Sequence, residues 1–206
     1  MDKTVAIATG ICFILISYLG WADKTNTNVE DHVDRVVRIC AVCHGEGGHS
    51  QVPQTPSLAG QSALYTAQQL KLFRGQTRLE ASPQAYMWGV SALLDDDTIT
   101  GLADYYESQT PSPGKIEKPR LIEKGKSIYL NGIPSKNLAA CSSCHGENGE
   151  GVAVFPRLAG QHAAYLFAQL QIFRTRLRPY SAVMIGITKN MTRDEMEAVA
   201  YYLQSK

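Results

Sequence analysis

Two copies of the pattern Cys-x-x-Cys-His are the part of this chain best suited to chemistry. The first copy spans Cys40–His44 and the second spans Cys141–His145. This pentapeptide is the attachment site of c-type haem, in which two thiols add to the haem vinyl groups and the adjacent imidazole ligates the iron. The predicted attachment residues are Cys40, Cys43, Cys141 and Cys144, and the predicted iron ligands beside them are His44 and His145. The chain is therefore expected to hold two covalently bound haem c groups and to transfer electrons.

Two other chemistries use a Cys-x-x-Cys pair. A four-cysteine zinc site has its pairs about 15 to 20 residues apart, whereas the pairs in this chain lie at residues 40–43 and 141–144. A thioredoxin-type dithiol needs a βαβ context, which the sequence does not show, and has no use for the two histidines. Haem attachment is the favoured interpretation, and zinc binding and dithiol exchange are the alternatives.

The chain repeats itself around the two motifs. The matching segments, given in pairs, are 45–48 and 146–149, Pro56–Gln61 and Pro156–Gln161, and the tyrosine pairs at 105–106 and 201–202. Between the copies, residues 110–119 contain three prolines and one glycine, which predicts a stiff linker. The predicted division is a leader at 1–24, a first domain at 25–110, a linker at 111–119 and a second domain at 120–206.

Apolar residues recur at helical spacing in both halves. In the first half this spacing predicts one helix from near Asp31 to the first motif and another through Ala63–Phe73. Terminal helices are expected to have their N-caps at Asp96 and at Thr192, where Glu195 would complete a capping box. No alternating run of β-branched residues predicts a sheet, so the expected fold class is all-α.

Size and charge limit the classes of function. The chain has 206 residues, and each half keeps roughly 90 of them, near the lower end of the usual domain range. Such a domain buries little apolar surface by itself, so a haem would supply much of its core. The formal net charge is +1, which gives no electrostatic basis for nucleic-acid binding or for long-range steering.

The N-terminal stretch Val5–Ala22 contains no charged residue. Lys3 before it and the small residues Gly20 and Ala22 at its end are typical of a cleaved secretory signal. Its length also just suffices to span a bilayer, as a retained membrane anchor would. Both interpretations place the domains in the periplasm, with association to the inner membrane if the stretch is retained. Cys12, inside this stretch, is expected to be an inert thiol.

The ligand on the far side of each iron sets its chemistry, because methionine raises the reduction potential and an open position lets a substrate bind. The histidines outside the motifs, His32, His49 and His162, are not repeated. Methionine is repeated, since Met87 and Met184 each follow a proline-containing loop and precede the terminal helix. They are the predicted distal ligands, and two core-filling methionines are the alternative.

With these segments in this order, residues 25–206 resemble the dihaem cytochrome c4 family, and more closely the c4-type cytochromes of acidophilic iron-oxidising bacteria. The resemblance implies two tandem class I cytochrome c domains packed around a haem–haem interface, with His/Met ligation at both irons. It also implies that the carbonyls of Pro56 and Pro156 accept a hydrogen bond from the free ring nitrogen of each ligating histidine. The longer loop at 131–140 is the clearest break in the repeat.

Two more pairs of residues are candidates for tuning the haems. Arg74 and Arg174, at matching helix positions, would pair with haem propionates, because the guanidinium fork suits carboxylates. Two solvated helix arginines are the alternative. Tyr86, beside Met87, would hydrogen-bond near the first haem, whereas Val183 at the matching position would not. The two reduction potentials are therefore expected to differ.

The predicted function is that of a one-electron carrier and not of an enzyme, because a His/Met iron leaves no position for a substrate. The resemblance implies transfer from periplasmic donors to a membrane terminal oxidase, with a small copper protein or a bc-type complex as further redox partners. A haem enzyme of the peroxidase or nitrite-reductase type, which needs an open iron position, is one alternative. A fixed electron-input subunit of a respiratory complex, tethered by residues 5–22, is the other.

Overall fold

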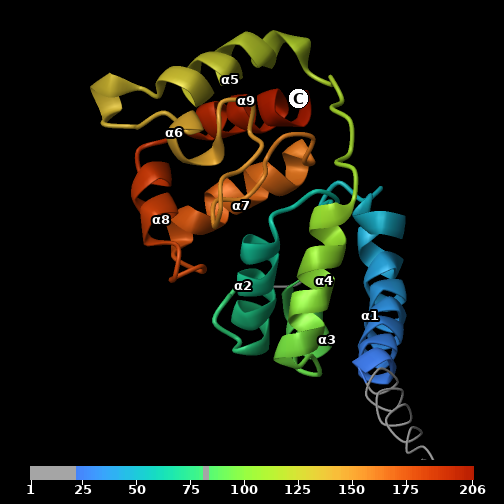
Figure 1. Ribbon diagram of the computed structural model, residues 1–206. Coiled ribbons are helices and arrows are strands. Elements are labelled where there is room, and N and C mark those ends of the chain that lie inside the picture. Colours follow the sequence, from blue (N-terminus) through green and yellow to red (C-terminus); the bar gives the residue numbers. More distant parts are fainter. Residues whose placement is uncertain (1–21, 81–83) are drawn as a thin grey trace, which may run out of the picture.

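The computed structural model describes residues 22–80 and 84–206, and in these residues the chain forms helices joined by loops (Figure 1). The helices of the first half are α1 (Ala22–His44), α2 (Ala63–Arg74), α3 (Gln84–Ser91) and α4 (Asp96–Ser108), with a 3₁₀ turn η1 (Glu46–Gly48) after α1. Those of the second half are α5 (Pro119–Asn131), α6 (Ser142–His145), α7 (Ala163–Thr175), α8 (Ala182–Thr188) and α9 (Arg193–Gln204), with a 3₁₀ turn η2 (Pro134–Lys136) after α5. Over these two ranges, β-type pairing is limited to isolated bridges from Ile133 to Leu138 and from Val152 to Phe155. The predicted all-α fold class is confirmed.

The N-terminal prediction lies mostly outside the described residues. The predicted leader covers residues 1–24, and the description of the chain begins at Ala22, so Cys12 and nearly all of Val5–Ala22 fall outside it. Among the residues that the structure does describe, no helix combines the length and the apolar character needed to cross a membrane.

Helices α1 and α4 form the core of the first half. The buried residues of this core are Val33, Val36, Val37, Leu94, Ile99 and Leu102. Burying each such side chain stabilises the fold by roughly 1.5–3 kcal/mol. The two helices approach closely at Gly101, where an added Cβ would lie 2.6 Å from Cγ2 of Val33. Helix α1 begins at Ala22, before the expected start near Asp31. Residues 22–30 contain no proline or glycine that would interrupt the helix.

Helices α5 and α9 form the core of the second half. Its buried residues include Ile128, Tyr129, Met196, Val199, Tyr202 and Leu203. These helices cross closely at Gly125, where an added Cβ would lie 2.7 Å from the backbone carbonyl carbon of Ala198. Tyr129, which is fully buried, donates a hydrogen bond from its hydroxyl to the carbonyl of Gly146. This core therefore fixes the turn that follows the second motif.

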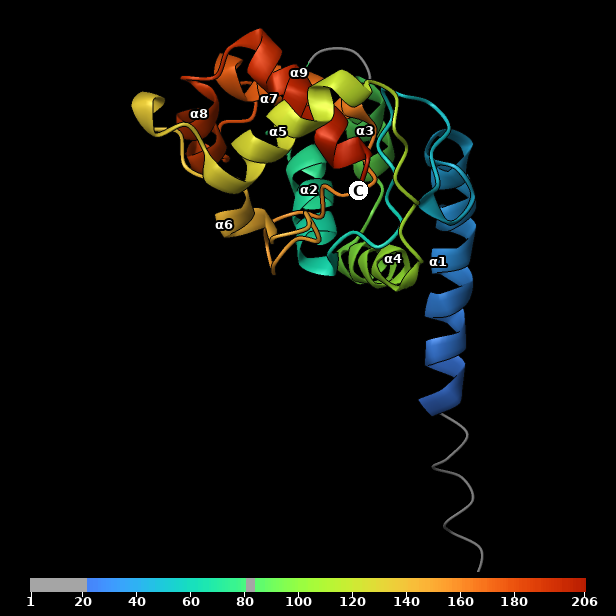
Figure 2. The ribbon, with the colours of Figure 1, turned by 90° about the horizontal axis from the view of Figure 1, so that it is seen from above.

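The halves meet through the segments that follow α2 and α7. The amide of Leu79 donates to the carbonyl of Leu177 at 2.7 Å, which pairs these two segments directly. The linker crosses from α4 to α5, and the amide of Lys115 donates to the carbonyl of Gln204 at 2.8 Å. In both ribbon views α1 lies at the outer edge of the first half, away from the second half (Figures 1 and 2). The two motifs are thus placed on separate units that share one interface.

Candidate haem sites

Each motif histidine is buried at the end of a helix. His44 ends α1 and His145 ends α6, and the two residues are 8% and 6% exposed. Nδ1 of His44 lies 2.9 Å from the carbonyl oxygen of Pro56, and Nδ1 of His145 lies 3.0 Å from that of Pro156. These are the contacts that the family resemblance implied. Since a carbonyl only accepts, each Nδ1 carries the proton and each Nε2 keeps its lone pair for a metal. Burial lowers the pKa of both rings, which keeps them neutral.

A glycine with positive φ follows each histidine and turns the chain. Gly45 has a φ of 79° and Gly146 has a φ of 84°, a region that residues with a Cβ rarely adopt. An added Cβ at Gly45 would lie 2.6 Å from the backbone carbonyl carbon of His49. At Gly146 it would lie 2.6 Å from a carboxylate oxygen of Glu150. The backbone conformation therefore requires the glycine of the repeated Cys-His-Gly sequence, just as haem binding requires the cysteine and the histidine.

The four motif cysteines are not joined in disulfides, so each is available to form a thioether bond to haem. Among the residues described, no group of three or more His, Cys, Asp or Glu side chains is placed to hold a metal ion. Burial raises the pKa of Cys40 and raises that of Cys141 to about 11. Zinc ligation and dithiol exchange both use the thiolate. The lowered thiol pKa that is typical of an exchange dithiol is therefore not found at Cys40 or Cys141.

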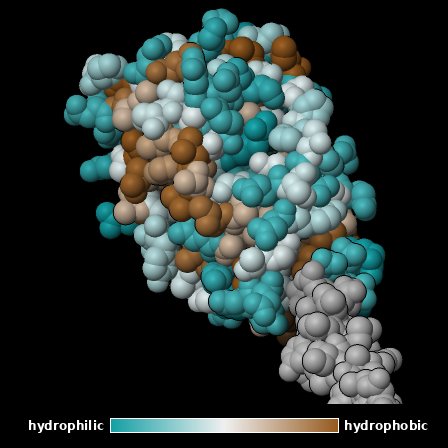
Figure 3. Space-filling view, viewed as in Figure 1, coloured by the Kyte–Doolittle hydropathy of each residue, from teal (hydrophilic) through white to brown (hydrophobic). Residues whose placement is uncertain are grey.

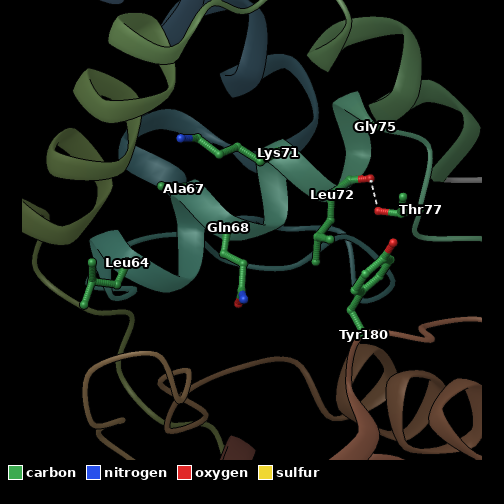
Figure 4. A pocket seen from close by; sticks show the side chains of 8 residues that line it. All are labelled: Leu64, Ala67, Gln68, Lys71, Leu72, Gly75, Thr77 and Tyr180. Carbon is green, nitrogen blue, oxygen red and sulfur yellow. Dashed lines mark hydrogen bonds between the residues drawn. The ribbon is translucent and has the colours of Figure 1, made fainter.

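Each half carries an exposed apolar surface. In the first half a groove runs along α2 and ends at Tyr180 of the second half (Figure 4). The residues that line it are Leu64, Ala67, Gln68, Lys71, Leu72, Gly75, Thr77 and Tyr180. Ala67 packs against the same core as Cys40. In the second half, apolar side chains gather on the surface over α7 and α8 (Figure 3), where Val183 is 63% exposed. A porphyrin presents wide apolar faces, so each half would need apolar surface of this kind to hold one.

Met87 and Met184 lie at matching positions on two short helices. Met87 is on α3, which packs against α2, and Met184 is on α8, which packs against α7. Both are half-buried. The indole N–H of Trp88 donates to the carbonyl of Arg78 at 2.9 Å and so anchors α3. Ile185 takes the place of this tryptophan on α8 and cannot donate. The methionines are therefore equivalent in position but differ in how their helices are held.

Two arginines that the sequence analysis did not select are buried between the halves. Arg78 and Arg178 are each 4% exposed, and Glu80 is 2% exposed. Glu80 forms an ion pair with Arg78, and one of its carboxylate oxygens lies 3.9 Å from Nε of Arg178. Both guanidinium groups also donate to Oε1 of Gln69, at 3.1 and 2.7 Å. This buried cluster therefore holds two positive charges and one negative charge.

The predicted tuning residues lie away from this cluster. Arg74 donates to Asp96 at 2.6 Å and to the carbonyl of Leu94 at 2.8 Å. Its guanidinium is thus held within the first half, and its pairing with a haem propionate stays a prediction. Arg174 is exposed, as a solvated helix arginine would be. Tyr86 is 77% exposed.

Two all-α halves, each with a Cys-x-x-Cys-His segment whose histidine is oriented by a proline carbonyl, define a c-type cytochrome with two domains. The model of the cytochrome c family matches residues 35–109 and 122–206. Cytochrome c-552 from Acidithiobacillus ferridurans is 40% identical over 173 residues, which cover 83% of this chain and 75% of the relative. A thiosulfate dehydrogenase electron acceptor from Stutzerimonas stutzeri is 34% identical over 203 residues, which cover 94% of this chain and 91% of the relative.

A solved structure extends the likeness to three dimensions. Cytochrome c4 from Acidithiobacillus ferrooxidans superposes with a TM-score of 0.77 and 39% identity, over 81% of this chain and 98% of that chain. The chain belongs to the cytochrome c family, within its dihaem cytochrome c4 group, and it carries two covalently bound haem c groups. Its role is electron transfer.

Proposed function

We propose that this chain carries single electrons in the periplasm between soluble donors and a membrane terminal oxidase. In this proposal the first haem is attached to Cys40 and Cys43 with His44 and Met87 as axial ligands, and the second to Cys141 and Cys144 with His145 and Met184. The observation that carries the proposal is the repeated histidine–proline contact, at 2.9 and 3.0 Å, which leaves Nε2 of each ring free beside a pair of thiols.

Bound haem supplies reversible one-electron exchange at its iron. The protein residues then have three tasks: the proline carbonyls orient the imidazoles, the methionines fill the far axial positions, and the apolar surfaces exclude water. With both axial positions filled, a substrate has no place to bind, which supports a carrier over a peroxidase or a nitrite reductase.

For the haem propionates we propose Arg78 and Arg178 in place of Arg74 and Arg174. The buried pair shares one carboxylate, Glu80, so the cluster has one uncompensated positive charge, which is costly in the interior. Within the described part of the chain, Nε of Arg178 is buried without a hydrogen-bond partner. A propionate would supply both the missing negative charge and an acceptor.

The division into a leader at 1–24, a first domain at 25–110, a linker at 111–119 and a second domain at 120–206 is part of this proposal. The leader would be either a secretory signal or an inner-membrane anchor. A small copper protein and a bc-type complex are the further partners that the family resemblance supports.

A second candidate function is that of a fixed electron-accepting subunit. The relative named as a thiosulfate dehydrogenase electron acceptor matches 94% of this chain, which favours a dehydrogenase as the donor. Purification from washed membranes and from periplasm distinguishes the two. A stable complex with a dehydrogenase would support the subunit, whereas a free protein that turns over with an oxidase would support the carrier.

The ligation is tested by the weak far-red sulfur-to-iron charge-transfer band of the oxidised protein. Met87→Ala and Met184→Ala should each remove part of this band, and the double variant should remove all of it. Met196→Leu is the control, because Met196 is a fully buried core residue of α9. Survival of the band in the double variant would overturn the assignment. A shift of the reduced Soret band on mixing wild-type protein with carbon monoxide would favour the enzyme alternative.

A further inference from the structure

Two glutamines from the repeated Pro-x-Leu-Ala-Gly-Gln segments connect the halves by reciprocal amide pairs. Nε2 of Gln161 donates to the carbonyl of Ser57 at 2.8 Å, and its Oε1 accepts from the amide of Ser57 at 2.9 Å. Nε2 of Gln61 donates to the carbonyl of Arg157 at 3.0 Å, and its Oε1 accepts from the amide of Arg157 at 2.8 Å. Both glutamines are buried, at 7% and 6% exposed. Each therefore binds the backbone of the other half at one residue.

In the first half, the amide that Gln161 binds is the peptide unit that orients the histidine. Pro56 and Ser57 share one peptide bond, whose carbonyl accepts from Nδ1 of His44 at 2.9 Å. The N–H of that same peptide bond donates to Oε1 of Gln161. One planar amide thus stands between the imidazole of one half and the glutamine of the other.

The second half contains the same arrangement in the opposite direction. Nδ1 of His145 donates to the carbonyl of the Pro156–Arg157 peptide bond at 3.0 Å, and the N–H of that bond donates to Oε1 of Gln61 at 2.8 Å. The amide of Ser62 also donates to this oxygen at 3.1 Å, which fixes the glutamine from its own side. Both connections are therefore built from rigid, fully paired groups.

We propose that Gln61 and Gln161 are positioning residues that act crosswise, each setting the orientation and electron donation of the axial histidine in the other half. This inference rests on the proposed ligation by His44 and His145. Hydrogen bonds in a chain polarise one another, so an acceptor at the N–H makes the carbonyl a stronger acceptor. A stronger acceptor at Nδ1 makes the imidazole a more basic ligand. A more basic ligand stabilises ferric iron, so each glutamine lowers the reduction potential of the haem in the other half.

Only glutamine meets both requirements at this length. Its amide has a donor and an acceptor in one plane, whereas leucine has neither and glutamate lacks the donor. Removing it would leave a buried N–H and a buried C=O without partners, and the peptide unit would be free to tilt. The histidine would then lose both the direction and the strength of its hydrogen bond.

The test is a redox titration of the haem-loaded full chain in which each haem is observed separately. In a Met184→His background the far-red sulfur-to-iron band reports the first haem, and in a Met87→His background it reports the second. Gln161→Leu is expected to raise the potential of the first haem and to leave the second unchanged. Gln61→Leu is expected to do the reverse. The expected change is a three- to tenfold shift in the ratio of ferric to ferrous haem at fixed potential, where tenfold corresponds to about 59 mV for one electron.

Two further variants serve as controls. Gln54→Leu makes the same chemical change at an exposed residue outside the groove along α2 and should move neither potential. Gln161→Glu keeps an acceptor for the N–H of Ser57, so the first potential should lie below that of Gln161→Leu. A general loss of folding would not produce this difference.

A shift of the haem in the same half, an equal shift of both haems, or unchanged potentials with the band intact would overturn the crosswise role. Absence of the band in wild-type protein would instead overturn the methionine ligation. In that case a redox titration followed at the Soret band still tests the crosswise role, because Gln161→Leu and Gln61→Leu should each shift a different one of the two one-electron steps.

Discussion

The first half reaches its motif through one long helix, α1, whereas the second half reaches it through α5, a loop with η2 and the four-residue α6. The contacts around the histidines are nevertheless alike, with Nδ1 at 2.9 and 3.0 Å from a proline carbonyl. The helix before the motif can therefore change while the ligand stays in place. The proline peptide and the glutamine that binds it are what the two halves keep in common.

The halves differ most at the interface, where their charges are not matched. Glu80 is buried beside Arg78, whereas Tyr180 at the corresponding position is 68% exposed and lies at the end of the groove along α2 (Figure 4). Trp88 anchors α3 to the carbonyl of Arg78, and α8 has no such donor at Ile185. Differences of this kind make the surroundings of the two haems unequal without changing their predicted ligands.

The largest effect on stability is expected for a change at Glu80, the carboxylate shared by Arg78 of the first half and Arg178 of the second half. Glu80→Gln removes the buried carboxylate that the two buried guanidinium groups share, so the free energy of unfolding should fall by about 3–5 kcal/mol. Urea titration of the haem-loaded protein measures the change. Glu123→Gln, at an exposed residue of α5, is the matched control, and Tyr180→Phe should have little effect. Equal losses for Glu80→Gln and Glu123→Gln would contradict the buried cluster.

The next effect compares the two cores. Gly125→Ala would bring its Cβ against the carbonyl oxygen of Ala198 in α9 and to 2.7 Å from its carbonyl carbon, whereas Gly101→Ala would bring its Cβ to 2.6 Å from a methyl group of Val33. A side chain can rotate and a helix backbone cannot, so the first change should cost about 3 kcal/mol and the second about 1 kcal/mol. Thermal unfolding gives both values. A larger loss for Gly101→Ala would show that the first core is the tighter one.

A smaller and more local effect is expected at α3. Trp88→Phe removes the donor to the carbonyl of Arg78, which should cost about 1 kcal/mol and move only the potential of the first haem. Tyr86→Phe on the same helix should move that potential less, because Tyr86 is 77% exposed. Redox titration compares the two variants. A larger shift for Tyr86→Phe would restore the tyrosine as the residue that separates the potentials.

The smallest effect concerns the surface ion pair of the first half. Arg74 holds the pKa of Asp96 below its ordinary value of 3.8. The stability from this carboxylate is present above that ordinary value and is lost as the pH falls through the lowered pKa. Asp96→Asn should therefore reduce the acid-dependent part of the unfolding free energy, whereas Asp97→Asn should not. Lys71 also pairs with Asp96, at 3.1 Å, so unfolding curves at neutral and acidic pH would show no difference between the variants only if neither cation were bound to Asp96.

The parts of the fold that follow local rules could be predicted from the sequence. The capping box of Thr192 and Glu195 is present at the start of α9, because it depends on residues three positions apart. The N-cap predicted for the terminal helix of the first half, Asp96, was wrong by one residue. Asp95 accepts a hydrogen bond from the amide of Thr98 and is the N-cap of α4. Among several adjacent aspartates the sequence does not indicate which one caps the helix.

The interface could not be predicted in the same way. Arg78 and Arg178 repeat at the same spacing as Tyr65 and Tyr165, which is the signal that could have identified them. Their burial, however, depends on how the two halves pack, and no local pattern encodes that. The repeat aligns Gln161 with Gln61 and gives no sign that either side chain contacts the other half. The contact of Gln161 with Ser57 is apparent only in the structure.

The reciprocal glutamines also give the contact between the halves the form of an isologous interface, in which residue i of one copy meets j of the other and j meets i. Gln61 reaches residue 157 and Gln161 reaches residue 57, as expected for two copies of one domain related by a twofold axis. The chain thus has the geometry of a symmetric homodimer whose subunits are joined by a tether. A short tether holds the domains at its two ends at a millimolar effective concentration. The two domains therefore re-associate after separation to an extent that does not depend on the protein concentration.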